Sequence, residues 1–360
     1  MKSKKNSISL LVMLALMGVT GFLFLKDQSL SALGDTIRNV NPLYLILGFT
    51  LMLVFVGSEA AASKMALSAM GHSVRYRRCF SYSGTGFYFS SITPSATGGQ
   101  PAQVYYMAKD GIPAAHGTLN MLLITVCYQV VTLVYAAAAW FLGGEAVARL
   151  GTGLGVLLGF GGTTMFLLTT MMLLFMFRPA IATRLAGWVL RLGVKVHLIK
   201  HEKKAQDALN HQMEEYRKGA ELLKTRPLLF PAMLGMTFVQ MTALYLVPYV
   251  VYRAFGLSGG SAVAIVATQA LVTLAVSCLP LPGSVGASEA GFVQAFTLFF
   301  GAGLVTPAML LSRGITFYGF LLVAAGITVY VHLRTAKTRG PVAVPNQPEI
   351  GYREKAERVA

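Results

Sequence analysis

The sequence has little charge and few cysteines. Only 12% of its 360 residues are Asp, Glu, Lys or Arg, against about 25% in soluble domains, while 55% are hydrophobic. The three cysteines, Cys79, Cys127 and Cys278, form no CxxC motif, so neither a disulfide framework nor a zinc site is indicated. These shortages exclude an ordinary soluble enzyme, a disordered chain and a secreted disulfide-rich protein.

Acidic residues are scarcer than basic ones. Thirty Lys and Arg against fourteen Asp and Glu give a formal net charge of +16. The basic residues gather in a few polar loops, which indicates membrane topology and not a nucleic-acid partner. Contact of these loops with anionic lipid headgroups is compatible with that reading. The sequence holds no G-x-x-x-x-G-K-[ST] motif, and we predict neither a cofactor nor a bound metal.

Long apolar segments predict an all-α polytopic membrane protein. A spanning helix needs about 20 apolar residues, and six segments qualify: 8–25, 43–70, 117–142, 150–177, 228–254 and 306–332. The first follows Lys2, Lys4 and Lys5 as a signal peptide would. Its apolar core is longer than a usual signal core, so we expect a retained helix. Two further apolar stretches, 81–108 and 261–303, are broken by Pro and Gly.

The distribution of Lys and Arg predicts the orientation. The N-terminus, residues 71–80, the basic segment 178–226 and the tail are rich in them, so both termini are expected in the cytoplasm. Residues 1–335 form one integral membrane domain, and 336–360 form a cytoplasmic polar tail. Each broken stretch must then begin and end on the same side of the membrane. It does so as a re-entrant dip or as a pair of crossings, giving six spans plus two dips or eight or more helices.

The two broken stretches resemble each other. Residues 94–100 read PSATGGQ and residues 282–289 read PGSVGASE, so both follow the pattern P-x-x-x-G-[GA]. Their flanking spans run in opposite directions, which is typical of an inverted-topology repeat with broken helices near the bilayer midplane. The alternative is that Pro and Gly only kink packed helices.

Half-helix N-termini at such breaks suit an anionic group such as a phosphate, because they present free N–H groups and a partial positive charge. We predict no catalytic residues. The candidate residues for binding a lipid headgroup are Thr93, Ser95, Thr97, Gly98, Gly99, Gln100, Gly283, Ser284, Gly286, Ser288, Glu289 and Arg313.

Four ionisable residues fall within or beside the apolar stretches, where charges usually face a cavity or a partner. They are Glu59, Lys64, Glu289 and Arg313. We expect Glu289 and Arg313 to face the same cavity. Arg313 then pairs with Glu289 or with a lipid phosphate, or it extends to the membrane interface. For Glu59 and Lys64, a structural pair or an interfacial position stands beside a functional role.

The chain resembles the flippase-like transmembrane domain of the lysylphosphatidylglycerol synthase family, the N-terminal half of the bacterial multiple peptide resistance factor. The similarity lies in residues 91–100, SITPSATGGQ, and 279–290, LPLPGSVGASEA, and it extends over about residues 8 to 335. Glu289 matches the acidic residue of the second family motif. Gln100 stands where the family often has an acidic residue, which argues against two symmetric carboxylates.

The resemblance implies that the chain moves a phospholipid, such as phosphatidylglycerol or its lysyl form, from the inner to the outer leaflet. Many relatives carry the name phosphatidylglycerol lysyltransferase, but lysyl transfer belongs to a separate soluble domain, and segment 178–226 is too short to form one. A separate synthase protein would then be a partner. Two alternatives stay open: a lysyltransferase, and a transporter of another lipid-linked phosphate.

Overall fold

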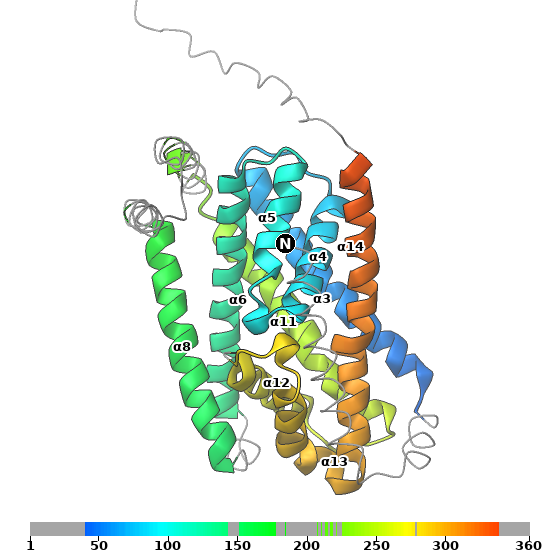
Figure 1. The fold of residues 1–360 in the computed structure, drawn as a ribbon. Coiled ribbons are helices and arrows are strands. Elements are labelled where there is room, and N and C mark those ends of the chain that lie inside the picture. Colours follow the sequence, from blue (N-terminus) through cyan, green and yellow to red (C-terminus); the bar gives the residue numbers. More distant parts are fainter. Residues whose placement is uncertain are drawn as a thin grey trace, which may run out of the picture.

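The computed structural model describes residues 40–142, 151–177, 225–277 and 279–337, with isolated residues between 184 and 221. Within these residues every regular element is helical (Figure 1), so the predicted all-α membrane fold is confirmed. The predicted span 8–25, nearly all of the basic segment 178–226 and the tail after residue 337 lie outside the described residues.

Five long apolar helices correspond to the predicted spans in the described part of the chain. They are α3 (Pro42–Ala69), α6 (Ala114–Leu142), α8 (Gly151–Phe177), α11 (Leu229–Ala254) and the last span, which is made of the end of α13 (Ala287–Arg313), the π-helical η3 (Gly314–Gly319) and α14 (Phe320–Lys337). The start of α3 shows the local cause. The Asn41 side chain accepts a hydrogen bond from the Leu43 amide at 3.0 Å, and Pro42 occupies the first turn, as helix N-termini favour.

Both broken stretches are re-entrant hairpins. The first consists of α4 (Tyr76–Ile92), the short η1 (Pro94–Ala96) and α5 (Gly99–Lys109). The second consists of α12 (Ala262–Ser277), η2 (Pro282–Ser284) and the first part of α13, which breaks at Gly301 with φ 70° and ψ 166°. The legs α4, α5 and α12 have 17, 11 and 16 residues, fewer than the about 20 that a crossing needs.

The tips of the two hairpins meet inside the bundle. Figure 1 shows α4 and α5 in the upper half of the molecule and α12 with the first part of α13 in the lower half. The short helices η1 and η2 contact each other, and η2 also contacts α4. The two halves of the predicted repeat therefore touch at the residues that carry the shared motif.

The two tips have the same backbone conformation at the two residues after each proline, and they diverge at Thr97 (ψ −17°) and Val285 (ψ 137°). The Ala96 amide donates to the Thr93 carbonyl at 3.2 Å, and at the matching place the Ser284 amide donates to the Leu281 carbonyl at 3.1 Å. Positive φ values occur at the same two positions after each proline: Ser95, Ala96, Gly283 and Ser284. Three of these four are not glycine, so each tip holds an uncommon conformation that its surroundings must maintain.

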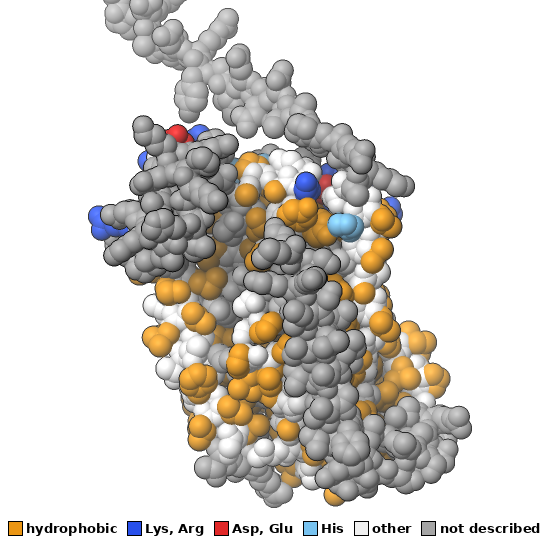
Figure 2. All heavy atoms as spheres, in the orientation of Figure 1, with side chains coloured by type: hydrophobic (Ala, Val, Ile, Leu, Met, Phe, Trp, Pro, Cys, Tyr) orange, Lys and Arg blue, Asp and Glu red, His pale blue; other side chains and the backbone are white. Residues whose placement is uncertain are grey.

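The surface is divided into an apolar middle and a charged end. Figure 2 shows hydrophobic side chains over the middle of the described surface, with the visible Lys and Arg side chains near the upper end. The exposed apolar residues belong to several helices and include Leu43, Phe166 and Leu322. A surface of this kind fits a lipid environment around the bundle.

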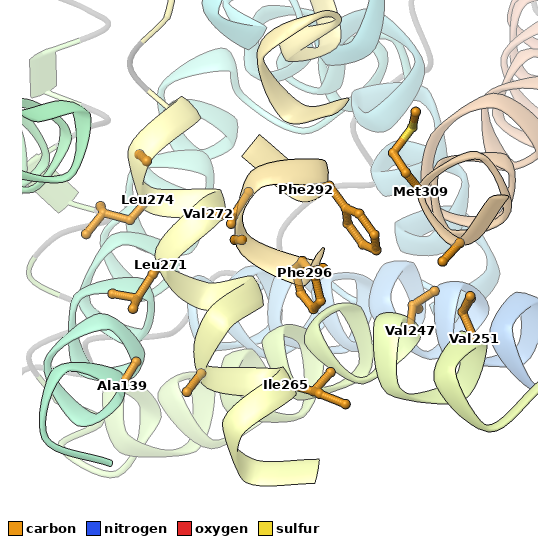
Figure 3. Close-up of a cluster of buried hydrophobic side chains, with 14 of the residues drawn as sticks. Ala139, Val247, Val251, Ile265, Leu271, Val272, Leu274, Phe292, Phe296 and Met309 are labelled. Carbon is orange, nitrogen blue, oxygen red and sulfur yellow. The ribbon is translucent and has the colours of Figure 1, made fainter. Parts of the chain in front are cut away.

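The second hairpin is held by a large apolar cluster. The stacked rings of Phe292 and Phe296 on α13, with centroids 4.2 Å apart, lie in one buried cluster with Val272 of α12 and Val247 of α11 (Figure 3). This packing fixes the leg of α13 against the crossing helices. It therefore determines where the tip that begins at Pro282 is held.

Candidate functional site

Glu289 lies in the first turn of α13, at the second tip. Its side chain is 2% exposed, and its Oε2 accepts a hydrogen bond from the Gly286 amide at 2.7 Å. A carboxylate in this position satisfies an otherwise unpaired N–H group and balances the positive end of the helix. The second half-helix therefore supplies its own anion.

Arg313 pairs with this carboxylate. Its Nε donates to Oε1 of Glu289 at 2.8 Å, and its Nη2 donates to the Gly283 carbonyl at 3.1 Å. The guanidinium also lies 4.4 Å from the ring centre of Phe317, and the side chain is 14% exposed. Of the alternatives that the sequence left open for Arg313, the structure forms the ion pair with Glu289.

The π-helical segment η3 adds a third donor that the sequence did not predict. The Tyr318 hydroxyl donates to Oε1 of Glu289 at 3.0 Å, five positions after Arg313. In an α-helix, residues five apart point about 140° apart, whereas a π-helix closes its turn between i and i+5. The π segment therefore brings Arg313 and Tyr318 onto one face. Apolar periodicity carries no signal for this geometry.

The first tip is capped by a neutral side chain. Thr93 Oγ1 accepts from the Gly98 amide at 2.9 Å and donates to the Phe89 carbonyl at 2.6 Å. In the described part of the chain, the next two amides, those of Gly99 and Gln100, have no acceptor. The positive end of α5 therefore carries free N–H groups and no carboxylate of its own.

Gln100 is held to the following span, as Glu289 is in the other half. Its Nε2 donates to Thr125 Oγ1 on α6 at 2.7 Å. In each half, a polar residue in the first turn of the half-helix thus bonds to a side chain on the next span. The bond is neutral in the first half and ionic in the second.

The two tips differ in exposure. Ser95, Thr97 and Gln100 of the first tip are exposed, and Thr97 donates its hydroxyl hydrogen to the Pro94 carbonyl. The second-tip residues Gly283, Ser284, Gly286 and Ser288 are only partly exposed, and Glu289 is buried. All twelve predicted site residues lie at the two tips or, for Arg313, in contact with one of them. Of the two tips, the first exposes its polar side chains more.

Close approach of α4 and α5 requires glycine. A Cβ atom on Gly99 would lie 2.7 Å from the Gly86 carbonyl oxygen, so a side chain there would push the two legs apart. The narrow first hairpin therefore depends on the absence of a side chain at Gly99.

Glu59 of α3 is a further carboxylate, partly exposed and outside the predicted set of binding residues. It accepts hydrogen bonds from Gln103 of α5 and Gln240 of α11. Lys64 is exposed, and no ion pair joins these two described residues. Within the residues that the structure describes, no three His, Cys, Asp or Glu side chains form a metal-binding group.

Comparison with known proteins agrees with this architecture. Residues 6–324 match the family model described as the lysylphosphatidylglycerol synthase TM region. The chain is also similar to a UPF0104 membrane protein of the archaeon Archaeoglobus fulgidus, with 22% identity over 317 residues, covering 86% of this chain and 92% of that protein.

Proposed function

This chain belongs to the lysylphosphatidylglycerol synthase TM-region family, and from this premise we propose that it moves a phospholipid with an anionic or aminoacylated headgroup, such as lysyl-phosphatidylglycerol, between membrane leaflets. The observation that carries the proposal is the meeting of two re-entrant tips, one of which exposes polar side chains at a half-helix N-terminus that has no carboxylate of its own. Irregular backbone at membrane depth occurs where it is buried in protein or lines a wet cavity.

The first tip is the better anion site of the two. The amides of Gly99 and Gln100 and the exposed hydroxyl of Ser95 provide donors for phosphate oxygens. At the second tip the amides of Ala287 and Ser288 also have no acceptor in the described part of the chain, but the Glu289 carboxylate bound to the Gly286 amide already supplies a negative charge there. A phosphate headgroup would therefore bind the first tip while its acyl chains stay in the lipid, which avoids the large penalty of placing a bare charge in hydrocarbon.

The proposed orientation follows from the charged end of the molecule. The end of α3, the start of α4, the end of α5 and the end of α14 lie together, and Arg75, Arg77, Arg78, Lys109 and Arg334 belong to these segments. Positive residues favour the cytoplasmic side. We place this end, with the end of α14, in the cytoplasm and the protein in the bacterial cell membrane. For the N-terminus, which lies outside the described residues, the proposal rests on its Lys residues alone.

The test is leaflet exchange in proteoliposomes that contain the purified protein. Fluorescent phosphatidylglycerol, its lysyl form and a zwitterionic lipid are followed with a membrane-impermeant quencher. We expect the wild type to exchange the first two faster than protein-free vesicles. Ser95→Ala removes the hydroxyl donor proposed for the phosphate, so we expect its rate to fall about tenfold, as for the loss of one hydrogen bond to a charged group.

A matched pair of threonine variants controls for nonspecific effects. Thr97→Val removes a hydroxyl at the first tip, and Thr170→Val removes one on the exposed face of α8; in both threonines the hydroxyl donates to a nearby backbone carbonyl at 2.9 Å. We expect a slower rate only for Thr97→Val. Equal exchange of all three lipids, or no exchange by folded protein, would contradict the proposed selectivity or the proposed function. Exchange of only a polyprenyl phosphate would reassign the substrate.

A further inference from the structure

Glu59 has an environment that the binding site at the tips does not explain. It lies in the membrane-spanning helix α3, and its side chain is turned to the interior of the bundle. Gln103 of α5 donates to Oε1 at 3.1 Å, and Gln240 of α11 donates to Oε2 at 3.2 Å. The carboxyl group thus joins the first hairpin to the crossing of α3 and α11, the central helices of the two halves.

No cation balances this carboxyl group in the described part of the chain. Glu289, the other intramembrane acid, has Arg313, whereas the groups that face Glu59 are neutral: amides from α5 and α11, the Ser83 hydroxyl from α4 and the Tyr128 phenol from α6. Tyr128 is a titratable group that faces Glu59. Glu59 is partly exposed, but a carboxylate without a cation inside a membrane-spanning bundle is disfavoured, so binding a proton stabilises it.

The side chains around Glu59 can form hydrogen bonds with its protonated form. Ser83, 2% exposed, is close to the carboxyl group, yet its hydroxyl oxygen has no hydrogen bond of regular geometry to any described residue, and Oε1 of Gln103 also has none. A neutral glutamic acid has one O–H donor, which the serine oxygen accepts. An ionised one accepts, and the serine hydroxyl then donates. The same side chain therefore serves both protonation states.

Proton binding weakens a hydrogen bond that holds the first hairpin, the one from Gln103 to Glu59. Amide hydrogen bonds to an ionised carboxylate are about twice as strong as those to a neutral acid. Gln103 lies one turn after Gln100 on α5, so a weaker bond at Glu59 loosens the helix whose N-terminus forms the exposed tip. Protonation of one group thereby affects the position of the proposed lipid site.

We propose that Glu59 is a proton-binding site that couples lipid movement to the proton gradient. The proposal rests on the proposed lipid transport. Its step is balanced: the carboxylate takes up one proton from one side of the membrane and releases it to the other, and no other reactant takes part.

The first test measures the proton without any transport. Infrared difference spectra of the purified protein across a pH titration should show the C=O stretch of a protonated carboxylic acid. The band should disappear in Glu59→Gln and persist in Lys64→Gln, which removes a charge from the exposed side of the same helix. Ser83→Ala should shift the band, and it carries the test if Glu59→Gln does not fold. A band that survives Glu59→Gln, or that Ser83→Ala leaves unshifted, overturns the proposal.

The second test measures coupling. In proteoliposomes with an imposed pH gradient, one proton for each lipid predicts about a tenfold change in the leaflet ratio of the lipid for each pH unit. Glu59→Gln should exchange lipid but ignore the gradient. A response retained in Glu59→Gln, or a response to a sodium gradient in place of the pH gradient, overturns the proposal. If the infrared band behaves as expected and no lipid moves, the proton site stands and the proposed lipid transport fails.

Discussion

Removing Arg313 while Glu289 remains should be far more harmful than removing both charges. The wild-type carboxylate accepts three hydrogen bonds, from Gly286, Arg313 and Tyr318, and its side chain is 2% exposed. Arg313→Met deletes the only one of these donors that carries a charge and leaves a buried anion. Breaking a buried pair in this way costs about 3–5 kcal/mol.

The double variant tests the reasoning behind that magnitude. Glu289→Gln with Arg313→Met keeps side chains of similar size, and the Gln can still accept from the Gly286 amide. A neutral replacement of a buried ion pair is often close to neutral in stability, so we expect a loss well below that of Arg313→Met alone. The free energy of unfolding in detergent micelles, measured as a double-mutant cycle, gives the coupling. Additive losses, or a single-variant loss below about 1 kcal/mol, would refute the argument.

Three further outcomes are expected. Gly99→Ala should lower the free energy of unfolding by about 1–3 kcal/mol, because the new Cβ meets the Gly86 carbonyl. The control Gly153→Ala, whose Cβ would have nothing within 4 Å, should leave the melting temperature unchanged or raise it. Arg334→Gln should lower the free energy of unfolding by about 1 kcal/mol, because it breaks the partly exposed ion pair with Asp110 at 2.6 Å that anchors α14 to the first hairpin. An unchanged melting temperature would contradict this. Burial and the nearby His116 ring lower the pKa of His72, so the unfolded chain binds the proton more readily and stability falls as the pH drops below about 6.5. Melting followed from about pH 7 to about pH 5 should show that fall in the wild type and a smaller one in His72→Asn.

Local sequence patterns predicted where the helices and breaks lie, but not which of them contact one another. The P-x-x-x-G motifs located both tips, because glycine and proline act on the backbone where they stand, and charge counting required each stretch to return to its own side. Charge counting could not separate dips from crossings. The short legs and the contact of η1 with η2 decide that question.

The site shows the same division. Glu289 with Arg313 was within reach of sequence reasoning, because two opposite charges in apolar segments need each other. Tyr318 was not, since its place beside them depends on a π-helical turn. The neutral partners of Glu59 come from helices far along the chain, and nothing in their local sequence marks Gln103 or Gln240 as neighbours.

The unequal bonds at the two tips have a consequence for the resting protein. An inverted repeat reaches its opposite-facing state when its halves exchange conformations, and chemically identical halves would make the two states equal in free energy. Here Glu289 with Arg313 is ionic, and Gln100 with Thr125 is neutral. Under the proposed transport, exchange would place each pair in the geometry of the other, so no symmetry makes the two states equal in free energy and we expect them to differ. In the absence of lipid and of any gradient, a protein that moves lipid as proposed would then open preferentially to one side of the membrane.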